Sequence, residues 1–351
     1  MIRGVLCFTS ISYHYLDRAR VLANSIREYH PDWHLALGLT DREPAGFRFS
    51  LDDEPFDSVV RAEDLDVPDL EAWLFKHDVV EICTAVKGPL LARFLAEGWQ
   101  KVIYLDPDIA LFSDLRPVVE ALDTYSIVLT PHQLAPEDQE QAIIDNEISS
   151  LKHGTYNLGF LAVRNDVNGR GVSDWWDARL RKYCYDQKER GLFVDQKWFD
   201  LVPALFDNVL ILRDPGYNVA SWNLTHRHLS IEDDGIFVND LYPLRFFHFT
   251  KLGPIGDQAT ARYAADNYEV HEIWAWYRRQ IDRWSAPGIP DDWWAYGHFP
   301  NGTKIPRGAR LMYRERHELQ RMFPSPFSDA SNGLAKWLEA NTALLGNRIR
   351  R

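Results

Sequence analysis

Short apolar runs alternate along the chain with segments in which apolar residues recur at helical spacing. The run GVLCFTS (residues 4–10) is followed by a helical pattern at 16–30 and then by a second run, HLALGLT (34–40). This order predicts a β-α-β unit. The same reasoning predicts further strands at 56–62, 101–108, 125–132, 158–165, 209–212 and 245–250, and a further helix at 86–95.

No internal repeat or low-complexity tract interrupts this alternation. Strands that alternate with helices are typical of an α/β fold, in which a mostly parallel sheet is covered by helices on both faces. In such sheets ligands bind at the carboxyl ends of the strands. We therefore expect the functional residues in the loops that follow the strands.

The pattern changes after Lys251. Six apolar residues fall on one face of a predicted helix: Val270, Ile273, Trp274, Tyr277, Ile281 and Trp284. We expect one domain at residues 1–253 and a helical, aromatic-rich C-terminal extension at 254–351. The aromatic residues of this extension either line an acceptor groove or form core, and core is the commoner place for tryptophan at helical spacing.

The chain has 351 residues, of which 46% are hydrophobic, and a formal net charge of −12. Its acidic balance, without a basic stripe, argues against a nucleic-acid partner. Cys7, Cys83 and Cys184 are too far apart to indicate a disulfide framework or a zinc site. The sequons at Asn223 and Asn301 are interpreted as chance matches.

The N-terminal run is too short for a signal peptide, and no apolar run reaches the ~20 residues of a membrane span. We therefore expect a cytoplasmic protein. The terminal NRIRR (347–351) either contacts the anionic inner face of a membrane or is merely solvated.

Two carboxylates, Asp106 and Asp108, follow the apolar run VIYL (102–105) directly, with Pro107 between them. Carboxylates at the end of a buried strand are seldom buried unless they are paired or bind a metal. For an isolated D-x-D, a solvated turn in which proline fixes φ is the favoured reading. The rest of the chain has to decide between the turn and the metal site.

Six further motifs occur in a fixed order around this pair: FTSISYHYLDRARVLANSI, Lys87, YNLGF, VDQKWF, GYN and FFHFT. Together with YLDPD they resemble glycosyltransferase family 8, whose members are glycogenin-like and galactosyltransferase-like. The resemblance spans residues 5 to 253 approximately. It implies a Rossmann-like GT-A fold and a retaining transfer of sugar from a nucleoside-diphosphate donor, expected to be UDP-linked, to a glycan or other hydroxyl acceptor.

The same resemblance implies a divalent cation, Mn²⁺ or Mg²⁺, held by Asp106, Asp108 and His248. The match at His248 is imperfect, because Lys251 stands where the family has glycine and the lysine and tryptophan that usually follow are absent. We expect the neighbouring phenylalanines to lower the pKa of His248 and keep it neutral, as a metal ligand must be. The same phenylalanines fit a histidine that is simply part of the core.

Further donor contacts are implied for Lys87, Thr9 and Tyr15. The resemblance gives Lys87 a contact with the donor and places Thr9 and Tyr15 where the uracil is seated. Without the motifs, Lys87 reads as a helix-surface lysine, whose substitution changes stability by less than ~0.5 kcal/mol.

The donor sugar is expected near Asn157, Gly159, Asp195 and Gln196. The asparagine would hold a sugar hydroxyl, the glycine would allow close approach of the chain, and Asp195 or Gln196 would stabilise an oxocarbenium-like centre. His132 and Glu147 are polar enough to lie near the acceptor, but no spacing argument supports either residue.

Two alternatives remain open. One is a sugar-nucleotide-binding protein that has lost transfer activity, although its site residues are intact. The other is a sugar nucleotidyltransferase, which would need a Gly-rich phosphate loop after the first strand, whereas FTSISYHY contains no glycine.

Overall fold

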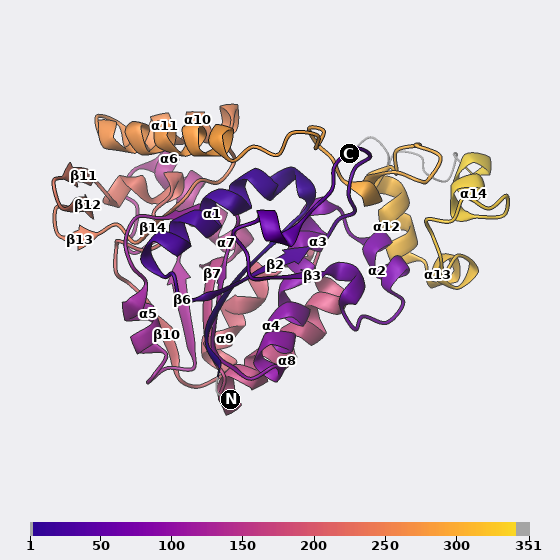
Figure 1. Ribbon diagram of the computed structural model, residues 1–351, viewed down its shortest axis with the longest axis horizontal. Helices are drawn as coiled ribbons and strands as arrows, with labels where there is room; N and C mark the ends of the chain where they lie inside the picture. Colours follow the sequence, from indigo (N-terminus) through magenta and orange to yellow (C-terminus); the bar gives the residue numbers. More distant parts are fainter. Residues whose placement is uncertain (1–2, 342–351) are drawn as a thin grey trace.

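A computed structural model describes residues 3–341 of the chain. A seven-stranded sheet lies at the centre of the fold (Figure 1). All neighbouring strands are parallel except β7, which runs antiparallel to both of its neighbours. The predicted α/β class with a mostly parallel sheet is thereby confirmed. In spatial order the strands are β10 (Val209–Ile211), β6 (Ile127–Pro131), β7 (Tyr156–Arg164), β4 (Trp99–Leu105), β1 (Arg3–Ile11), β2 (His34–Leu39) and β3 (Ser58–Arg61).

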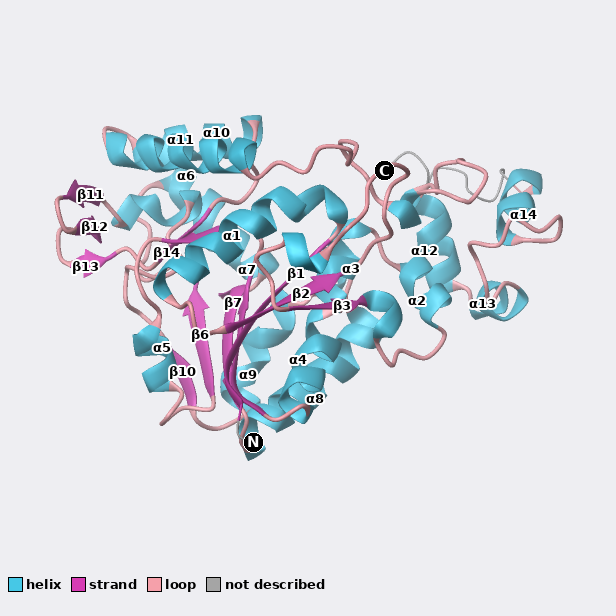
Figure 2. Ribbon diagram, in the orientation of Figure 1, coloured by secondary structure: helices cyan, strands magenta, loops and turns pink. Residues whose placement is uncertain are grey.

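Helices cover both faces of the sheet and create two separate apolar cores (Figure 2). On one face, α1 (Leu16–Tyr29) and α5 (Arg116–Ala121) pack on the side of β1 that carries Cys7. On the other face, α4 (Lys87–Ala96) and α8 (Val167–Tyr183) pack on the side that carries Phe8. Because successive strand residues point to opposite faces, a central strand must be apolar throughout, as the VIYL run is.

Smaller elements surround the sheet and were mostly outside the sequence-based prediction. The helices are α2 (Leu70–Lys76), α3 (Val79–Ala85), α6 (Glu140–Ala142), the π-helix η4 (Ile143–Ile148), α7 (Ser149–His153), the 3-10 helices η6 (Gln196–Leu201) and η7 (Ser221–His226), and α9 (Val202–Leu205). The strands are β5 (Ile109–Leu111) with β14 (Phe246–His248), β8 (Asp186–Gln187) with β9 (Leu192–Phe193), and β11 (Leu229–Glu232) with β12 (Gly235–Val238) and β13 (Tyr242–Pro243).

The C-terminal region is helical, as expected, and packs in two places (Figure 1). Helices α10 (Pro254–Ala264) and α11 (Tyr268–Arg283) pack near β14, whereas α12 (Arg307–Glu315), α13 (His317–Met322) and α14 (Leu334–Ala340) pack beside α2. Trp274 and Tyr277 are buried, so the core reading holds for the α11 face.

The arginine-rich segment 347–351 lies outside the described residues. Among residues 3–341, no helix combines the length and apolar character that crossing a membrane requires.

Candidate active site

The acidic pair lies at the carboxyl end of β4, where the strand turns away from the sheet. The Asp106 N–H donates to the Gly159 carbonyl of β7 at 2.8 Å, and the Ile109 N–H closes the turn on the Asp106 carbonyl at 3.1 Å. The chain then continues directly into β5. This turn projects both carboxylates from the sheet edge at which an α/β fold binds ligands.

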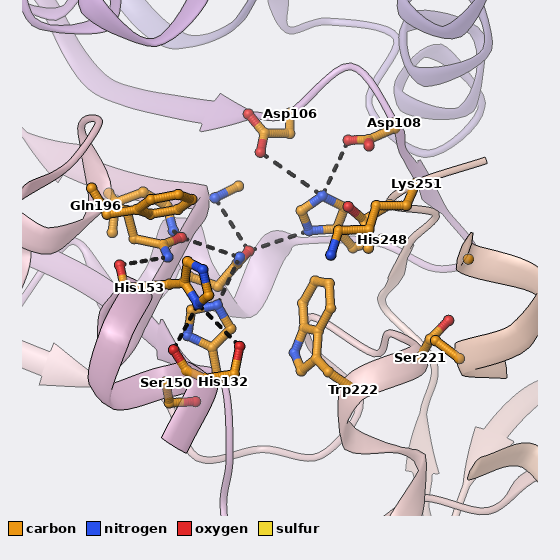
Figure 3. A pocket seen from close by; sticks show the side chains of 18 of the residues that line it. Asp106, Asp108, His132, Ser150, His153, Gln196, Ser221, Trp222, His248 and Lys251 are labelled. Carbon is orange, nitrogen blue, oxygen red and sulfur yellow. Dashed lines mark hydrogen bonds and ion pairs between the residues drawn. The ribbon is translucent and has the colours of Figure 1, made fainter. Parts of the chain in front are cut away.

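The short β5–β14 ribbon brings His248 to this turn. The two strands are antiparallel with His248 opposite Ile109, and the Phe249 N–H donates to the Asp108 carbonyl at 2.7 Å. His248 Nε2 lies 3.1 Å from Asp108 Oδ1 and 3.8 Å from Asp106 Oδ2 (Figure 3). One ligand atom from each of the three side chains lies within 4.8 Å of the others, as binding of one ion requires.

Asn157 fixes the orientation of the His248 ring, and Gly159 in turn holds the Asn157 side chain. Asn157 Oδ1 lies 3.2 Å from His248 Nδ1 and also accepts the Gly159 N–H at 3.2 Å. Because an amide oxygen only accepts, the Nδ1 atom carries the proton and Nε2 faces the acids. A hydrogen bond of this kind, which fixes the tautomer, is typical of metal-binding histidines.

The predicted lowering of the pKa of His248 is wrong. Burial lowers the pKa, but the charges of Asp108 and Asp106 outweigh it, and the net pKa is raised above its usual value. The same ion pair outweighs the burial of Asp108 and lowers the pKa of that carboxyl. The sequence-based argument counted the phenylalanines and omitted the carboxylates that the fold places beside the ring.

Lys87 is a buried ion-pair partner, not the helix-surface lysine that the sequence alone favoured. It begins α4, and its side chain is only 3% exposed. Its Nζ lies 3.1 Å from Asp106 Oδ1, 3.0 Å from Asp195 Oδ2 and 3.1 Å from the Leu158 carbonyl. Burial lowers the pKa of Lys87, but the two carboxylates outweigh it and raise the pKa well above its usual value.

Tyr104 adds a further contact that the sequence analysis missed. Its hydroxyl donates to Asp106 Oδ1 at 2.6 Å, and the Lys87 ammonium lies 4.1 Å from the centre of its ring. Residues two apart on a strand share a face, so the spacing of Tyr104 and Asp106 was the available signal. Asp106 is therefore held in place from two sides.

Asp195 and Gln196 stand at the start of η6, opposite the first residues of β7. Burial raises the pKa of Asp195 to about 6, with Lys87 opposing the rise. Gln196 Oε1 accepts the Leu158 N–H at 3.1 Å and the Asn157 Nδ2 at 3.3 Å, while its Nε2 donates to the His153 carbonyl at 3.1 Å. This amide therefore braces the β7 segment that carries Asn157.

His132 also belongs to this network. Its Nδ1 lies 3.2 Å from the Thr155 carbonyl, and its Nε2 lies 3.2 Å from Asn157 Nδ2, so the ring donates through Nδ1 and accepts through Nε2. Burial lowers the pKa of His132 to about 4, which keeps the ring neutral. Glu147, in contrast, accepts the Glu137 N–H at 2.7 Å and lines neither of the two cavities described next.

Two cavities meet at the acidic pair. The first, of about 640 Å³, contains Asn157, Gly159, Asp195, Gln196 and His248. The second, of about 560 Å³, lies toward the end of β1. Six residues line both cavities: Tyr15, Val80, Thr84, Lys87, Asp106 and Asp108.

The structure does not bring the Thr9 side chain to either cavity. Thr9 is fully buried in β1, whereas Ser10 and Ser12 line the second cavity. Tyr15 lines both cavities, and the Arg18 guanidinium lies 4.1 Å from the centre of its ring.

The C-terminal extension reaches both cavities. Arg262 and Tyr263 of α10 line the first cavity, and Trp293, Trp294 and Lys304 line the second. The extension is therefore part of the site on the side of β1 as well as on the side of β7.

The fold and the site together define an α/β protein with a candidate divalent-metal site at the carboxyl edge of its sheet. No protein-family model matches the chain. The uncharacterized protein YfnF of Bacillus subtilis (strain 168) is 30% identical over 176 residues, which are 50% of this chain and 57% of YfnF. The uncharacterized protein YfnD of the same organism is 23% identical over 249 residues, 69% of this chain and 76% of YfnD. The matched region thus spans little more than half the length of YfnF.

Three solved structures with a similar course of the chain are named as glycosyltransferases. The galactosyltransferase LgtC, in complex with donor and acceptor sugar analogs, aligns with 83% of this chain and 98% of its own at 16% identity and a TM-score of 0.47. Mouse xyloside xylosyltransferase 1 aligns with 72% of this chain and 99% of its own at 13% identity and a TM-score of 0.41. GlyE of Streptococcus pneumoniae TIGR4 aligns with 81% and 63% at 15% identity and a TM-score of 0.41. At these values the likeness carries no argument about activity, which depends on the site.

Proposed function

We propose that this chain is a metal-dependent glycosyltransferase of the GT-A type. It would move a sugar from a nucleoside-diphosphate donor, expected to be a UDP-sugar, to a glycan or other hydroxyl acceptor, in glycan biosynthesis. The observation that carries the proposal is the convergence of Asp106, Asp108 and His248 where two cavities meet. A diphosphate bound there would have a cavity for its nucleoside on one side and a cavity for its sugar on the other.

The three side chains fit a divalent cation such as Mn²⁺ or Mg²⁺. Two carboxylates supply hard oxygen ligands, and His248 presents Nε2 to the same point. When bound, such a cation would stabilise the negative charge that develops on the leaving diphosphate. Asn157 and Tyr104 hold His248 and Asp106 in position through hydrogen bonds, and the Gly159 N–H in turn holds the Asn157 side chain.

The second cavity is the proposed nucleoside site. Tyr15 offers an aromatic ring to a base, and Ser10 and Ser12 offer polar groups to its edge or to the ribose. We assign the role that the sequence analysis gave to Thr9 to Ser10 and Ser12 instead, because these two serines line the second cavity and Thr9 does not.

The first cavity is the proposed site of the donor sugar. Asn157, Asp195 and Gln196 line it next to Lys87. The Asp195 carboxylate and the Gln196 amide are the groups proposed to stabilise an oxocarbenium-like centre. Lys87 lies between Asp195 and Asp106, forms an ion pair with each and so offsets the repulsion between the two carboxylates.

Retention of anomeric configuration is the outcome we propose. An inverting enzyme needs an unpaired carboxylate base opposite the leaving group. Among the described residues that line the first cavity, Asp106 and Asp195 pair with Lys87, Asp145 pairs with Arg262, and Asp108 is a proposed metal ligand beside His248. In a retaining reaction the leaving phosphate oxygen can accept the proton of the acceptor hydroxyl, and no such base is needed.

Donor binding is the first test. UDP with Mn²⁺ should raise the melting temperature, because a ligand that binds only the folded chain stabilises it by mass action. UDP alone in excess chelator should not. A chain whose melting temperature is indifferent to every nucleoside diphosphate and nucleotide sugar, with or without metal, would refute the proposal.

The product separates the remaining alternatives. Release of nucleoside diphosphate with transfer supports the transferase, release of pyrophosphate supports a nucleotidyltransferase, and binding without turnover supports a sugar-nucleotide-binding protein. Proton NMR of fresh product should show the anomeric configuration of the donor. A cytoplasmic location and peripheral contact with the inner face of the membrane remain predictions, to be checked by fractionation of cells.

A further inference from the structure

The first cavity has a second wall that faces the proposed donor-sugar wall. Gln196 lies on one side in Figure 3, and Trp222 and Ser221 lie on the other. This second wall is formed by η7 and α10. Three of its lining residues have small side chains: Ser221, Gly256 and Ala259.

Trp222 differs from every other tryptophan of the chain. All thirteen lie within the described residues 3–341, and each of the others belongs to one of the four apolar clusters. Trp222 belongs to none of them. Its ring instead meets two histidine rings of the site edge to face, with centroid distances of 5.2 Å to His248 and 5.6 Å to His132.

The backbone that carries Trp222 is held from three directions. Gln133 Nε2 donates to the Trp222 carbonyl at 2.7 Å. The buried Asn223 side chain accepts the Ala220 N–H at 3.0 Å and donates to the Asn218 carbonyl at 2.9 Å. A large aromatic ring outside the core has no packing reason to be fixed in this way, but a rigid binding surface does.

The neighbouring residue ties this segment to α10. Ser221 Oγ and Thr260 Oγ1 are 2.7 Å apart and buried. The position of Trp222 relative to the α10 side of the cavity is therefore set before any ligand arrives.

The chemistry of this wall matches a pyranose ring. The face of an aromatic ring carries partial negative charge and attracts C–H groups, which a pyranose presents on its apolar face. Ser150 lines the same cavity, and its hydroxyl, which donates to the Asn146 carbonyl at 2.7 Å, can still accept from a sugar hydroxyl.

We propose that Trp222 is the stacking platform for a saccharide acceptor, with the acceptor's pyranose ring between it and the donor sugar. This inference rests on the proposed transferase function and extends it by naming the acceptor class and the residue that binds it. The Trp222 and His248 rings are 5.2 Å apart, so a sugar stacked on Trp222 would lie near the candidate metal ligands.

The direct test labels the full chain with 5-fluorotryptophan and assigns the Trp222 resonance by its loss in Trp222→Phe. With UDP and diamagnetic Mg²⁺ present, methyl glycosides of glucose, galactose and N-acetylglucosamine are added one at a time. At least one should shift the Trp222 resonance while that of Trp276, which packs on Phe112 in another cluster, stays in place. A panel in which no glycoside shifts the Trp222 resonance overturns the proposal.

Kinetics supply a second readout. Loss of an aromatic contact of this kind should raise the acceptor KM of Trp222→Leu about fivefold to tenfold, with a smaller effect in Trp222→Phe. Hydrolysis of the donor in the absence of acceptor should fall by a smaller factor than the acceptor KM rises, and Trp276→Phe is the matched control. An unchanged acceptor KM, or an equal loss of donor hydrolysis, would contradict the role given to Trp222.

Failure of the proposal can be told apart from failure of the proposed function. If wild-type protein does not bind UDP with metal, the transferase proposal falls. If wild type and Trp222→Phe bind UDP and metal alike and glycosides leave Trp222 untouched, only the acceptor assignment falls.

Discussion

Substitution of Gly159 by alanine isolates the geometry of the candidate metal site. A Cβ at this position would lie 2.6 Å from His248 Cε1, 2.9 Å from His248 Nδ1 and 2.7 Å from Asn157 Oδ1. These separations are shorter than real Cβ contacts, so the imidazole or the amide must move. The φ angle of Gly159 is not positive, so the substitution acts through this clash and not through backbone strain.

The expected size follows from the two groups that must move. Overpacking of a buried site typically costs about 1–3 kcal/mol of stability. A change in the hydrogen bond that orients a metal-binding histidine typically lowers metal affinity about 10-fold to 100-fold. We therefore expect Gly159→Ala to fold, with a modest loss of stability and a large loss of Mn²⁺ affinity.

Calorimetric titration with Mn²⁺ and urea unfolding measure the two effects separately. Gly4→Ala is the matched control, because a Cβ at Gly4 meets nothing within 4 Å. The same substitution in a His248→Ala background should cost much less stability, since the ring that clashes is gone. Wild-type Mn²⁺ affinity in a folded Gly159→Ala chain would refute the assignment of His248, and an equal cost in the His248→Ala background would refute the clash.

Three further outcomes are expected. Lys87→Met should lower the free energy of unfolding by about 3–5 kcal/mol, because it leaves two acids without their buried partner; urea unfolding that matches wild type would restore the surface reading of this lysine. Burial raises the pKa of Asp41 from 3.8 to about 6, so the folded chain holds this proton more tightly than the unfolded chain does. The stabilising contribution of Asp41 is complete below its unfolded pKa and is lost as the pH rises through 6, so Asp41→Asn should gain about 3 kcal/mol on wild type between about pH 4 and pH 6; parallel stability curves for the two proteins would contradict this. Asp108→Asn should abolish the metal-dependent part of the UDP thermal shift without unfolding the chain, and a full shift in this variant would remove Asp108 from the ligand set.

The strands of the sheet could be predicted because a buried strand is recognisable from its own short stretch of sequence. A run such as VIYL in β4 is apolar on both faces, and nothing distant is needed to interpret it. The antiparallel direction of β7 and the pairing of β14 with β5 are different, since they depend on contacts between segments far apart in the chain. The sequence therefore predicted the strands but not the ribbon that delivers His248.

Side-chain burial marks the limit of the site prediction. Lys87 was placed in the site by a motif, but its ion pairs follow from the way α4 begins beside the ends of β4 and η6. Thr9 and Ser10 differ by one residue, and a one-residue step on a strand changes the face to which a side chain points. The sequence did not single out Trp222, because a tryptophan is usually part of the core. That Trp222 lies outside the apolar clusters is known only once the structure has placed the other tryptophans.

Residues on both sides of the domain boundary expected at residue 253 line the candidate site. Asp41, at the end of β2, accepts the Ala295 N–H at 2.8 Å, and Trp293 Nε1 donates to the Arg42 carbonyl at 2.8 Å. Tyr296 Oη adds a bond of 3.0 Å to Glu63. These hydrogen bonds hold residues 293–296, which line the second cavity in part, against the ends of β2 and β3 beside the proposed nucleoside site. Since α10 lines the first cavity, the extension contributes walls to both cavities, so the acceptor side expected from the sequence would be only one part of its role.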